Sequence, residues 1–73
     1  MTMDLSRQAA GFEGIIKDLT GDSRLVARLI ELGFIRGETI RIEGRAPFGD
    51  PILVEVRGAI IALRAVEASC IRL

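Results

Sequence analysis

The sequence predicts a mainly β fold, a small barrel of about five strands with one α-helix between the first and second strands. Two changes in hydrophobic periodicity predict it. Up to Gly33, apolar residues recur at helical spacing, at Leu25, Val26, Leu29, Ile30 and Leu32. After Gly37 the period changes to two, and the segment 39–43 alternates as a half-buried strand does. The chain therefore passes from helix into sheet within a few residues.

The predicted helix runs from Ser23 to Leu32. Asp22 or Ser23 can cap its first turn, because a side-chain oxygen accepts a hydrogen bond from a free N–H group there. Gly33 follows the last periodic residue, and a residue without Cβ enters the left-handed conformation of a helix end at low cost. Gly37 comes directly before the next strand, and we expect it to form the turn that reverses the chain onto the sheet.

Strands are predicted on both sides of the helix. The first covers 12–17, where Gly14 permits a close backbone approach or a bulge. After the helix come, in order, strands at 39–45, 52–57 and 59–64, a helical turn at 65–68 and a short closing strand at Ile71. Five short strands and one helix match an SH3-like barrel, in which pairing around the barrel leaves few free edges. We therefore expect residues 1–73 to form a single domain.

Alternation assigns side chains to the two faces of the barrel. The inward set is Ile16, Leu25, Leu29, Leu32, Ile40, Ile42, Val54, Val56, Ile61, Leu63 and Ile71. The outward set of the central hairpin is Arg41, Glu43, Arg45, Leu53, Glu55 and Arg57. Pairing Arg45 with Glu55 places opposite charges across from each other, whereas a slip by two residues places Glu43 opposite Glu55. The first register is predicted, with 49–51 as a tight tip and Phe48 facing Ile52.

The balanced charge and the near absence of His and Cys argue against nucleic-acid binding, zinc binding and acyl-transfer catalysis. Ten basic and ten acidic residues cancel, whereas non-specific nucleic-acid binding needs a basic surplus. The chain has no His and one Cys, which removes the common zinc sites and the Ser-His and Cys-His pairs of acyl-transfer enzymes. We interpret Cys70 as a small hydrophobic residue. We therefore expect neither enzyme activity nor a bound cofactor.

The acidic residues and the apolar runs bear on metals and membranes. The carboxylates are scattered along the chain, so we expect no dedicated ferrous site, while a weak surface site for a divalent ion stays open. The longest aliphatic run, 59–63, is far shorter than the ~20 residues of a membrane span. No signal segment opens the chain. We expect a cytoplasmic protein that does not insert into the membrane.

Three groups of residues carry a resemblance. The segment 32–37 reads Leu-Gly-Phe-Ile-Arg-Gly, and 47–52 reads Pro-Phe-Gly-Asp-Pro-Ile. The third group is Ile61, Ala62, Leu63 and Arg64 with Glu67, Ala68 and Ile71. In this order and spacing, together with Leu5 and Gly11, they resemble the ferrous iron transport protein A (FeoA) family over almost the whole chain. The resemblance implies an SH3-like barrel that serves bacterial ferrous iron uptake as a cytoplasmic accessory to a membrane iron permease with a GTPase domain.

The loop before the third predicted strand supplies the candidate partner surface. The partner-binding residues are Phe48, Leu53, Pro47 and Asp50, and the structural glycines are Gly33, Gly37 and Gly49. The chain has neither Trp nor Tyr, which argues against a groove for a polyproline helix, because such grooves are lined by these residues. Two interpretations of Phe48 remain: it packs on its own barrel, or it is an anchor presented to a partner.

Three classes of function follow. The leading one is a non-catalytic interaction module for an iron permease. The second is a stand-alone regulatory or metal-sensing domain that resembles the C-terminal domain of metal-dependent repressors. The third is an enzyme, for which the sequence offers no identifiable nucleophile or general base. The sequence leaves open whether the permease is activated, assembled or inhibited, and whether the chain forms a weak homo-oligomer.

Overall fold

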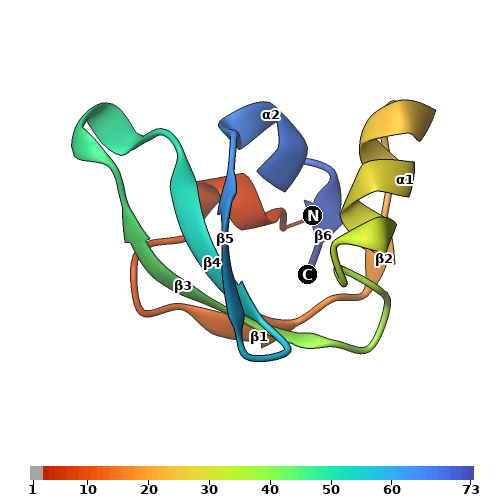
Figure 1. The fold of residues 1–73 in the computed structure, drawn as a ribbon, viewed down its shortest axis with the longest axis horizontal. Coiled ribbons are helices and arrows are strands. Elements are labelled where there is room, and N and C mark those ends of the chain that lie inside the picture. The colour runs from red at the N-terminus through yellow and green to blue at the C-terminus, as the bar shows by residue number, and fades with distance from the viewer. Residues whose placement is uncertain (1–2) are drawn as a thin grey trace.

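The structure, a computed structural model, describes residues 3–73 (Figure 1). Its elements in chain order are η1 (Leu5–Arg7), β1 (Glu13–Ile15), β2 (Asp18–Leu19), α1 (Ser23–Glu31), β3 (Thr39–Arg45), η2 (Pro47–Gly49), β4 (Ile52–Val56), β5 (Ala59–Leu63), α2 (Ala65–Ala68) and β6 (Ile71–Arg72). Four strands form an antiparallel sheet in the order β1-β3-β4-β5, and β2 pairs with β6 in a second sheet. The mainly β architecture with one main helix is as predicted.

Both ends of α1 are fixed by its capping residues. The Asp22 carboxylate accepts hydrogen bonds from the backbone N–H groups of Arg24 and Leu25, at 2.9 and 3.2 Å. Asp22, one of the two candidates, is therefore the N-cap. The helix begins at Ser23 as predicted, and it ends with Leu32 as its C-cap.

Gly33 closes α1 in the conformation that the sequence predicts, with a φ of +107°. Its N–H donates to the carbonyl of Ile30 at 3.0 Å, and the N–H of Phe34 donates to the carbonyl of Leu29 at 2.9 Å. These two bonds form the helix-ending motif that a glycine after the last turn permits. The motif turns the chain back on itself, so that Phe34 and Leu29 both enter the core. Gly37 also has a positive φ, +92°, at the predicted turn.

The short strand β2 was not predicted. Asp18 pairs with Arg72 and Leu19 with Ile71, so the segment before α1 pairs with the last strand of the chain. As a result α1 follows β2 and not the first strand. Two residues are too few to show alternation, and their partner strand lies at the other end of the sequence, so no local pattern indicates the pairing.

The predicted register of the central hairpin is wrong. Arg41 lies opposite Glu55, and Arg45 lies opposite Ile52. The length of the connection explains most of the difference, because Arg45 pairs with Ile52 and residues 46–51 join the strands, whereas the prediction placed Phe48 opposite Ile52. One extra residue in β3 between Ile42 and Gly44 adds a further shift of one position. Opposite charges still face each other, since Arg41 takes the place opposite Glu55 that was assigned to Arg45.

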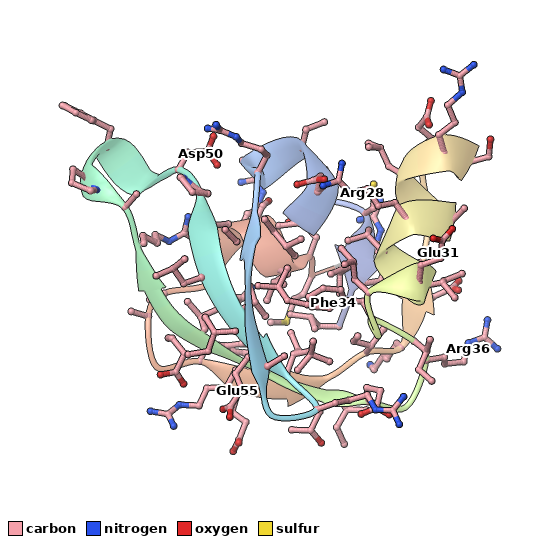
Figure 2. All side chains as sticks on the ribbon, viewed as in Figure 1. Arg28, Glu31, Phe34, Arg36, Asp50 and Glu55 are labelled. Carbon is pink, nitrogen blue, oxygen red and sulfur yellow. The ribbon has the colours of Figure 1, made fainter. Side chains whose placement is uncertain are left out.

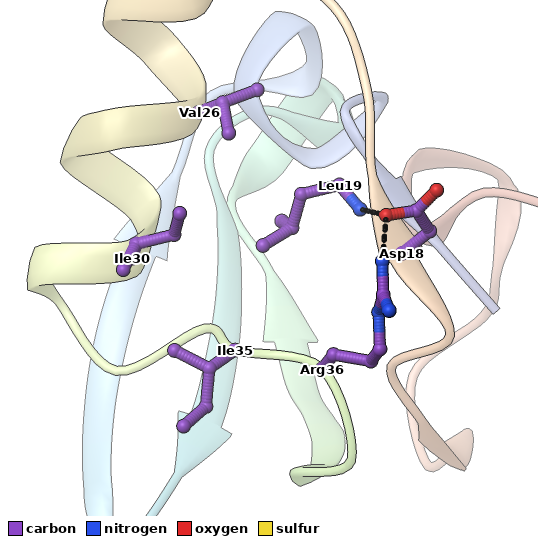
Figure 3. Close-up of a pocket in the computed structure, with 6 residues that line it drawn as sticks. All are labelled: Asp18, Leu19, Val26, Ile30, Ile35 and Arg36. Atoms are coloured by element: carbon purple, nitrogen blue, oxygen red, sulfur yellow. Dashed lines mark hydrogen bonds and ion pairs between the residues drawn. The ribbon is translucent and has the colours of Figure 1, made fainter.

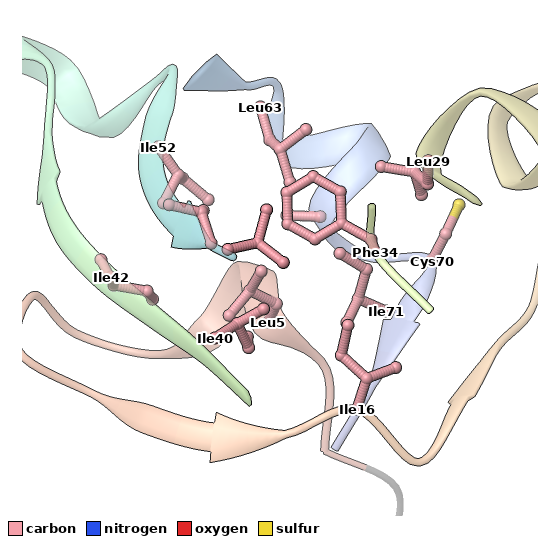
Figure 4. Packing of buried hydrophobic residues seen from close by; sticks show 13 residues of the cluster. Leu5, Ile16, Leu29, Phe34, Ile40, Ile42, Ile52, Leu63, Cys70 and Ile71 are labelled. Carbon is pink, nitrogen blue, oxygen red and sulfur yellow. The ribbon is translucent and has the colours of Figure 1, made fainter. Parts of the chain in front are cut away.

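The core lies between the four-stranded sheet, α1, α2 and β6 (Figure 4). Of the predicted inward set, the buried members are Ile16, Leu29, Ile40, Ile42, Val54, Val56, Leu63 and Ile71. Leu25 and Ile61 are only partly buried, and Leu32 is 38% exposed because it lies at the helix C-cap. The core residues that the prediction missed are Leu5, Phe34, Ile52, Ala68 and Cys70. Cys70 is buried, as its interpretation as a small hydrophobic residue requires.

Candidate partner-binding site

The connection between β3 and β4 projects from one end of the sheet (Figure 1). It contains the single turn η2, and Phe48 within that turn has a φ of +74°. Phe48 has a relative exposure of 106%, so its ring packs against none of the described residues. Between the two interpretations of Phe48, packing on its own barrel is therefore wrong for this structure.

Arg45, at the end of β3, stabilises the loop through hydrogen bonds. Its guanidinium donates hydrogen bonds to the carbonyls of Gly49 at 3.2 Å, of Ser6 at 2.9 Å and of Gln8. Each bond joins a charged donor to a backbone carbonyl, which is the stronger class of hydrogen bond. One side chain therefore ties the loop to the segment around η1.

Backbone bonds and Asp50 hold the other side of the loop. The N–H of Ala46 donates to the carbonyl of Pro51 at 3.0 Å, closing the loop at its base. The Asp50 carboxylate accepts the N–H of Ala65 at 2.8 Å and lies 3.4 Å from the Arg64 guanidinium. Because these contacts join the loop to α2, the exposed ring of Phe48 stands on a fixed support.

The predicted surface residues do not form one cluster. Leu53 lies opposite Gly44 on β4 and is 38% exposed, next to Ala62 of β5. Since Phe48 is fully exposed, it does not contact Leu53. The prediction that Phe48 faces Ile52 is wrong, because Ile52 pairs with Arg45. Pro47 is exposed beside Phe48, and Gly49 has the positive φ, +86°, of a turn residue.

A groove that the sequence did not predict lies between α1 and β2 (Figure 3). Its volume is about 230 Å³, and its apolar lining consists of Leu19, Val26, Ile30 and Ile35. Asp18 and Arg36 form an ion pair of 3.1 Å at its rim. The backbone N–H of Leu19 and then the Arg36 guanidinium hold the pKa of Asp18 below its usual range. The helical spacing of Val26 and Ile30 is the one local signal of this groove.

Outside the loop and the groove, the features that bear on chemistry are the thiol of Cys70 and the placement of the acidic side chains. Burial raises the pKa of the Cys70 thiol, and the Asp22 charge adds to the effect. Within residues 3–73, no group of three or more His, Cys, Asp or Glu side chains is placed to hold a metal ion. No helix in the same range is long and apolar enough to cross a membrane. Most charged side chains lie on the outside of the molecule (Figure 2), whereas Glu67 of α2 is buried.

Solved structures share this fold. An FeoA-like protein from Clostridium acetobutylicum superposes with a TM-score of 0.90 at 31% identity, covering 97% of this chain and 83% of that one. FeoA of Stenotrophomonas maltophilia, solved with zinc and described as an SH3 domain protein, gives a TM-score of 0.82 at 32% identity, covering 94% and 86%. The predicted SH3-like barrel is therefore confirmed. ScaR with bound Cd²⁺ gives a TM-score of 0.83 at 26% identity, covering 96% of this chain and 34% of that one.

Sequence comparison points to the same family. A curated relative, the Fe(2+) transport protein A/Fe(2+) transporter FeoB fusion protein of Porphyromonas gingivalis, is 30% identical over 67 residues. The alignment covers 92% of this chain, which spans only 8% of that relative. The family model of the FeoA domain matches residues 3–73. The chain belongs to the FeoA family of ferrous iron transport.

Proposed function

We propose that this chain is a cytoplasmic accessory module that modulates a membrane ferrous iron permease with a GTPase domain. One observation carries the proposal: in the relative from Porphyromonas gingivalis, an FeoA domain and the transporter FeoB form one polypeptide. Covalent fusion holds two domains at a high effective concentration and so increases the fraction of time that they are in contact. Such a fusion is therefore expected for domains that act on each other. This chain spans 8% of that fusion protein, and the contact between its FeoA domain and a permease is the proposed part of its function.

The module acts by binding and not by catalysis. Its one thiol, Cys70, is buried, and burial raises the pKa of that thiol. A buried thiol with a raised pKa is a poor nucleophile, because the thiolate is the reactive form. The FeoA protein of Stenotrophomonas maltophilia is described as a candidate activating factor for ferrous iron transport, and activation through contact fits this chemistry.

We assign the main contact to Phe48, with Pro47 beside it, and a second, separate contact to Leu53 on the adjacent strand β4. A fully exposed aromatic ring on a supported loop loses little conformational freedom when it enters a pocket, so more of the contact energy appears as affinity. Arg45 and Asp50 provide that support through the bonds described above. In this proposal Asp50 positions the loop, and the partner offers an apolar pocket on its cytoplasmic domain.

The test is ferrous iron uptake in bacterial cells that lack the native protein. A variant carrying Phe48→Ser and Leu53→Asp is expected to keep its fold by circular dichroism and to lose complementation. The matched control carries Val66→Ser and Ile15→Asp, which alter two side chains exposed to 61% and 59% on other elements. Full uptake with the first variant, or equal loss with the control, would reject Phe48 and Leu53 as the partner surface.

A second function is supported by the likeness to ScaR, whose structure contains bound Cd²⁺. In this alternative the chain is a regulatory or metal-sensing domain. Deleting the chain would then change transcript levels of iron-responsive genes at constant permease content. The accessory role instead predicts a change in uptake rate at constant permease content, with transcripts altered only as cellular iron falls.

A further inference from the structure

The strand β5 is an unguarded sheet edge. It is the last strand in the order β1-β3-β4-β5, and within residues 3–73 no strand pairs with its outer side (Figure 1). Its sequence, Ala-Ile-Ile-Ala-Leu, contains no charge and no proline. Edge strands of natural proteins are commonly protected by charges, prolines or bulges, because their free backbone groups pair with any available strand. Within β5 none of these devices is present.

The turn before β5 determines which backbone groups are free. Arg57 and Gly58 have φ values of +52° and +83°, as the two-residue turn of a tight hairpin requires. Val56 and Ala59 then exchange hydrogen bonds across the hairpin, and the N–H and C=O groups of alternate residues point toward β4. It follows that the backbone groups of Ile60 and Ala62 point away from β4.

Ile60 and Ala62 are also accessible. Their backbone groups point away from β4, and among the described residues they make no hydrogen bond to any other segment. Ile60 is 61% exposed, and Ala62 is exposed as well. The edge therefore presents two donors and two acceptors, together with one large apolar side chain.

We propose that β5 pairs with β5 of a second copy of this chain, antiparallel, about a two-fold axis at Ile61. Ile60 of each copy then lies opposite Ala62 of the other, and the two pairs exchange four hydrogen bonds. The registers centred on neighbouring residues are poorer. A centre at Ala62 would place Ile60 opposite Arg64, whose N–H already donates to the Glu67 carboxylate at 2.8 Å. A centre at Ile60 would require Gly58 of the hairpin turn as a partner.

Side chains favour a second copy as the occupant. In the proposed register the two Ile60 side chains are diagonal neighbours on the outer face and cover each other. No like charges lie directly opposite, because the strand has none. The nearest cations are already paired, Arg57 with Glu38 at 3.8 Å and Arg64 with Asp50 at 3.4 Å. Two antiparallel copies of β5 therefore match each other both in hydrogen bonds and in apolar contacts.

The association should be weak, since one pair of short strands buries far less area than a stable interface. We expect a dissociation constant on the order of 0.1 to 1 mM, in the range that NMR measures directly. Translational diffusion of the whole chain from 0.05 to 2 mM should report dimer formation. In a mixture of labelled and unlabelled protein, an isotope-filtered NOE should join the α-protons of Ile61 in the two copies.

The decisive variant is Ala62→Pro. It removes an N–H that points away from β4, so the internal ladder stays complete, and proline is tolerated at such edge positions. Ala62→Val keeps the N–H and is the matched control. We expect at least tenfold weaker association for Ala62→Pro and an unchanged constant for Ala62→Val.

Three results would overturn the proposal. The first is a wild-type chain that stays monomeric at 2 mM, and the second is a folded Ala62→Pro variant that associates like the wild type. The third is a β5 edge whose amide signals shift only when a permease cytoplasmic domain is added, which would assign the edge to that partner. If Ala62→Pro fails to fold, the isotope-filtered NOE of the wild type is the test, because it needs no variant. Absence of that NOE at 2 mM would then overturn the proposal.

Discussion

Replacing Phe48 with Asn should stabilise the protein. Phe48 is held at a φ of +74°, a left-handed conformation that costs an ordinary L-residue about 1–2 kcal/mol, whereas Asn adopts it more readily. The exposure of 106% means that removing the ring loses no burial. The free energy of unfolding should therefore rise by about 0.5–1 kcal/mol. In a domain of this size, that gain corresponds to an increase in Tm of about 3–6 °C.

The measurement is urea and thermal unfolding of Phe48→Asn beside Phe48→Leu. Leu keeps the strained backbone and an apolar side chain, so its stability should match the wild type within about 0.5 kcal/mol. If Phe48 is the docking anchor, Phe48→Asn gains stability while uptake falls. A loss of more than about 1 kcal/mol in Phe48→Asn would show that the ring packs on its own barrel in solution, and the strain argument would be wrong.

Two further predictions concern positive φ values at either side of one contact. Gly33→Val should lower the free energy of unfolding by about 1–2 kcal/mol through backbone strain, and not through a clash, because an added Cβ would meet only the Arg57 side chain, at 3.6 Å. Gly33→Ala is the milder comparison. A Gly33→Val variant that melts like the wild type would contradict the helix-cap interpretation. Arg57→Asn should gain about 0.5 kcal/mol, since Asn suits the turn at φ +52° and the exposed pair with Glu38 contributes little. Equal or lower stability would show that the Arg57 side chain offsets the strain.

Local patterns predict the parts of this fold that local interactions determine. The helix, its Asp22 cap and the Gly33 end follow from spacing and capping chemistry within a few residues. Three downstream strands and α2 lie close to their predicted ranges for the same reason. Alternation also placed most of the buried residues of β3 and β4, because the pleat of a strand determines the face of each side chain.

Long-range pairing determines the parts that were missed. β2 exists only because β6 lies beside it, more than fifty residues later, and the groove beside α1 exists only because β2 does. The longer connection at 46–51, with a smaller contribution from the bulge between Ile42 and Gly44, moved the hairpin register; Arg45 and Asp50 hold this connection through partners far away in the sequence. Phe34 was not placed in the core because it follows the helix, and the reversal at Gly33 is what carries it inward.

The two strained residues differ in a way that separates structure from function. Among the described residues, Phe48 and Arg57 are those other than glycine that have a positive φ. Arg57 has a structural reason within the chain, since it occupies the two-residue turn between β4 and β5, which requires a positive φ. Phe48 has none, because its ring is fully exposed while Arg45 and Asp50 hold the backbone beneath it. A residue that breaks a local rule without a compensating contact is best explained by a partner, and this asymmetry is why we assign docking to the Phe48 loop and not to the turn at Arg57.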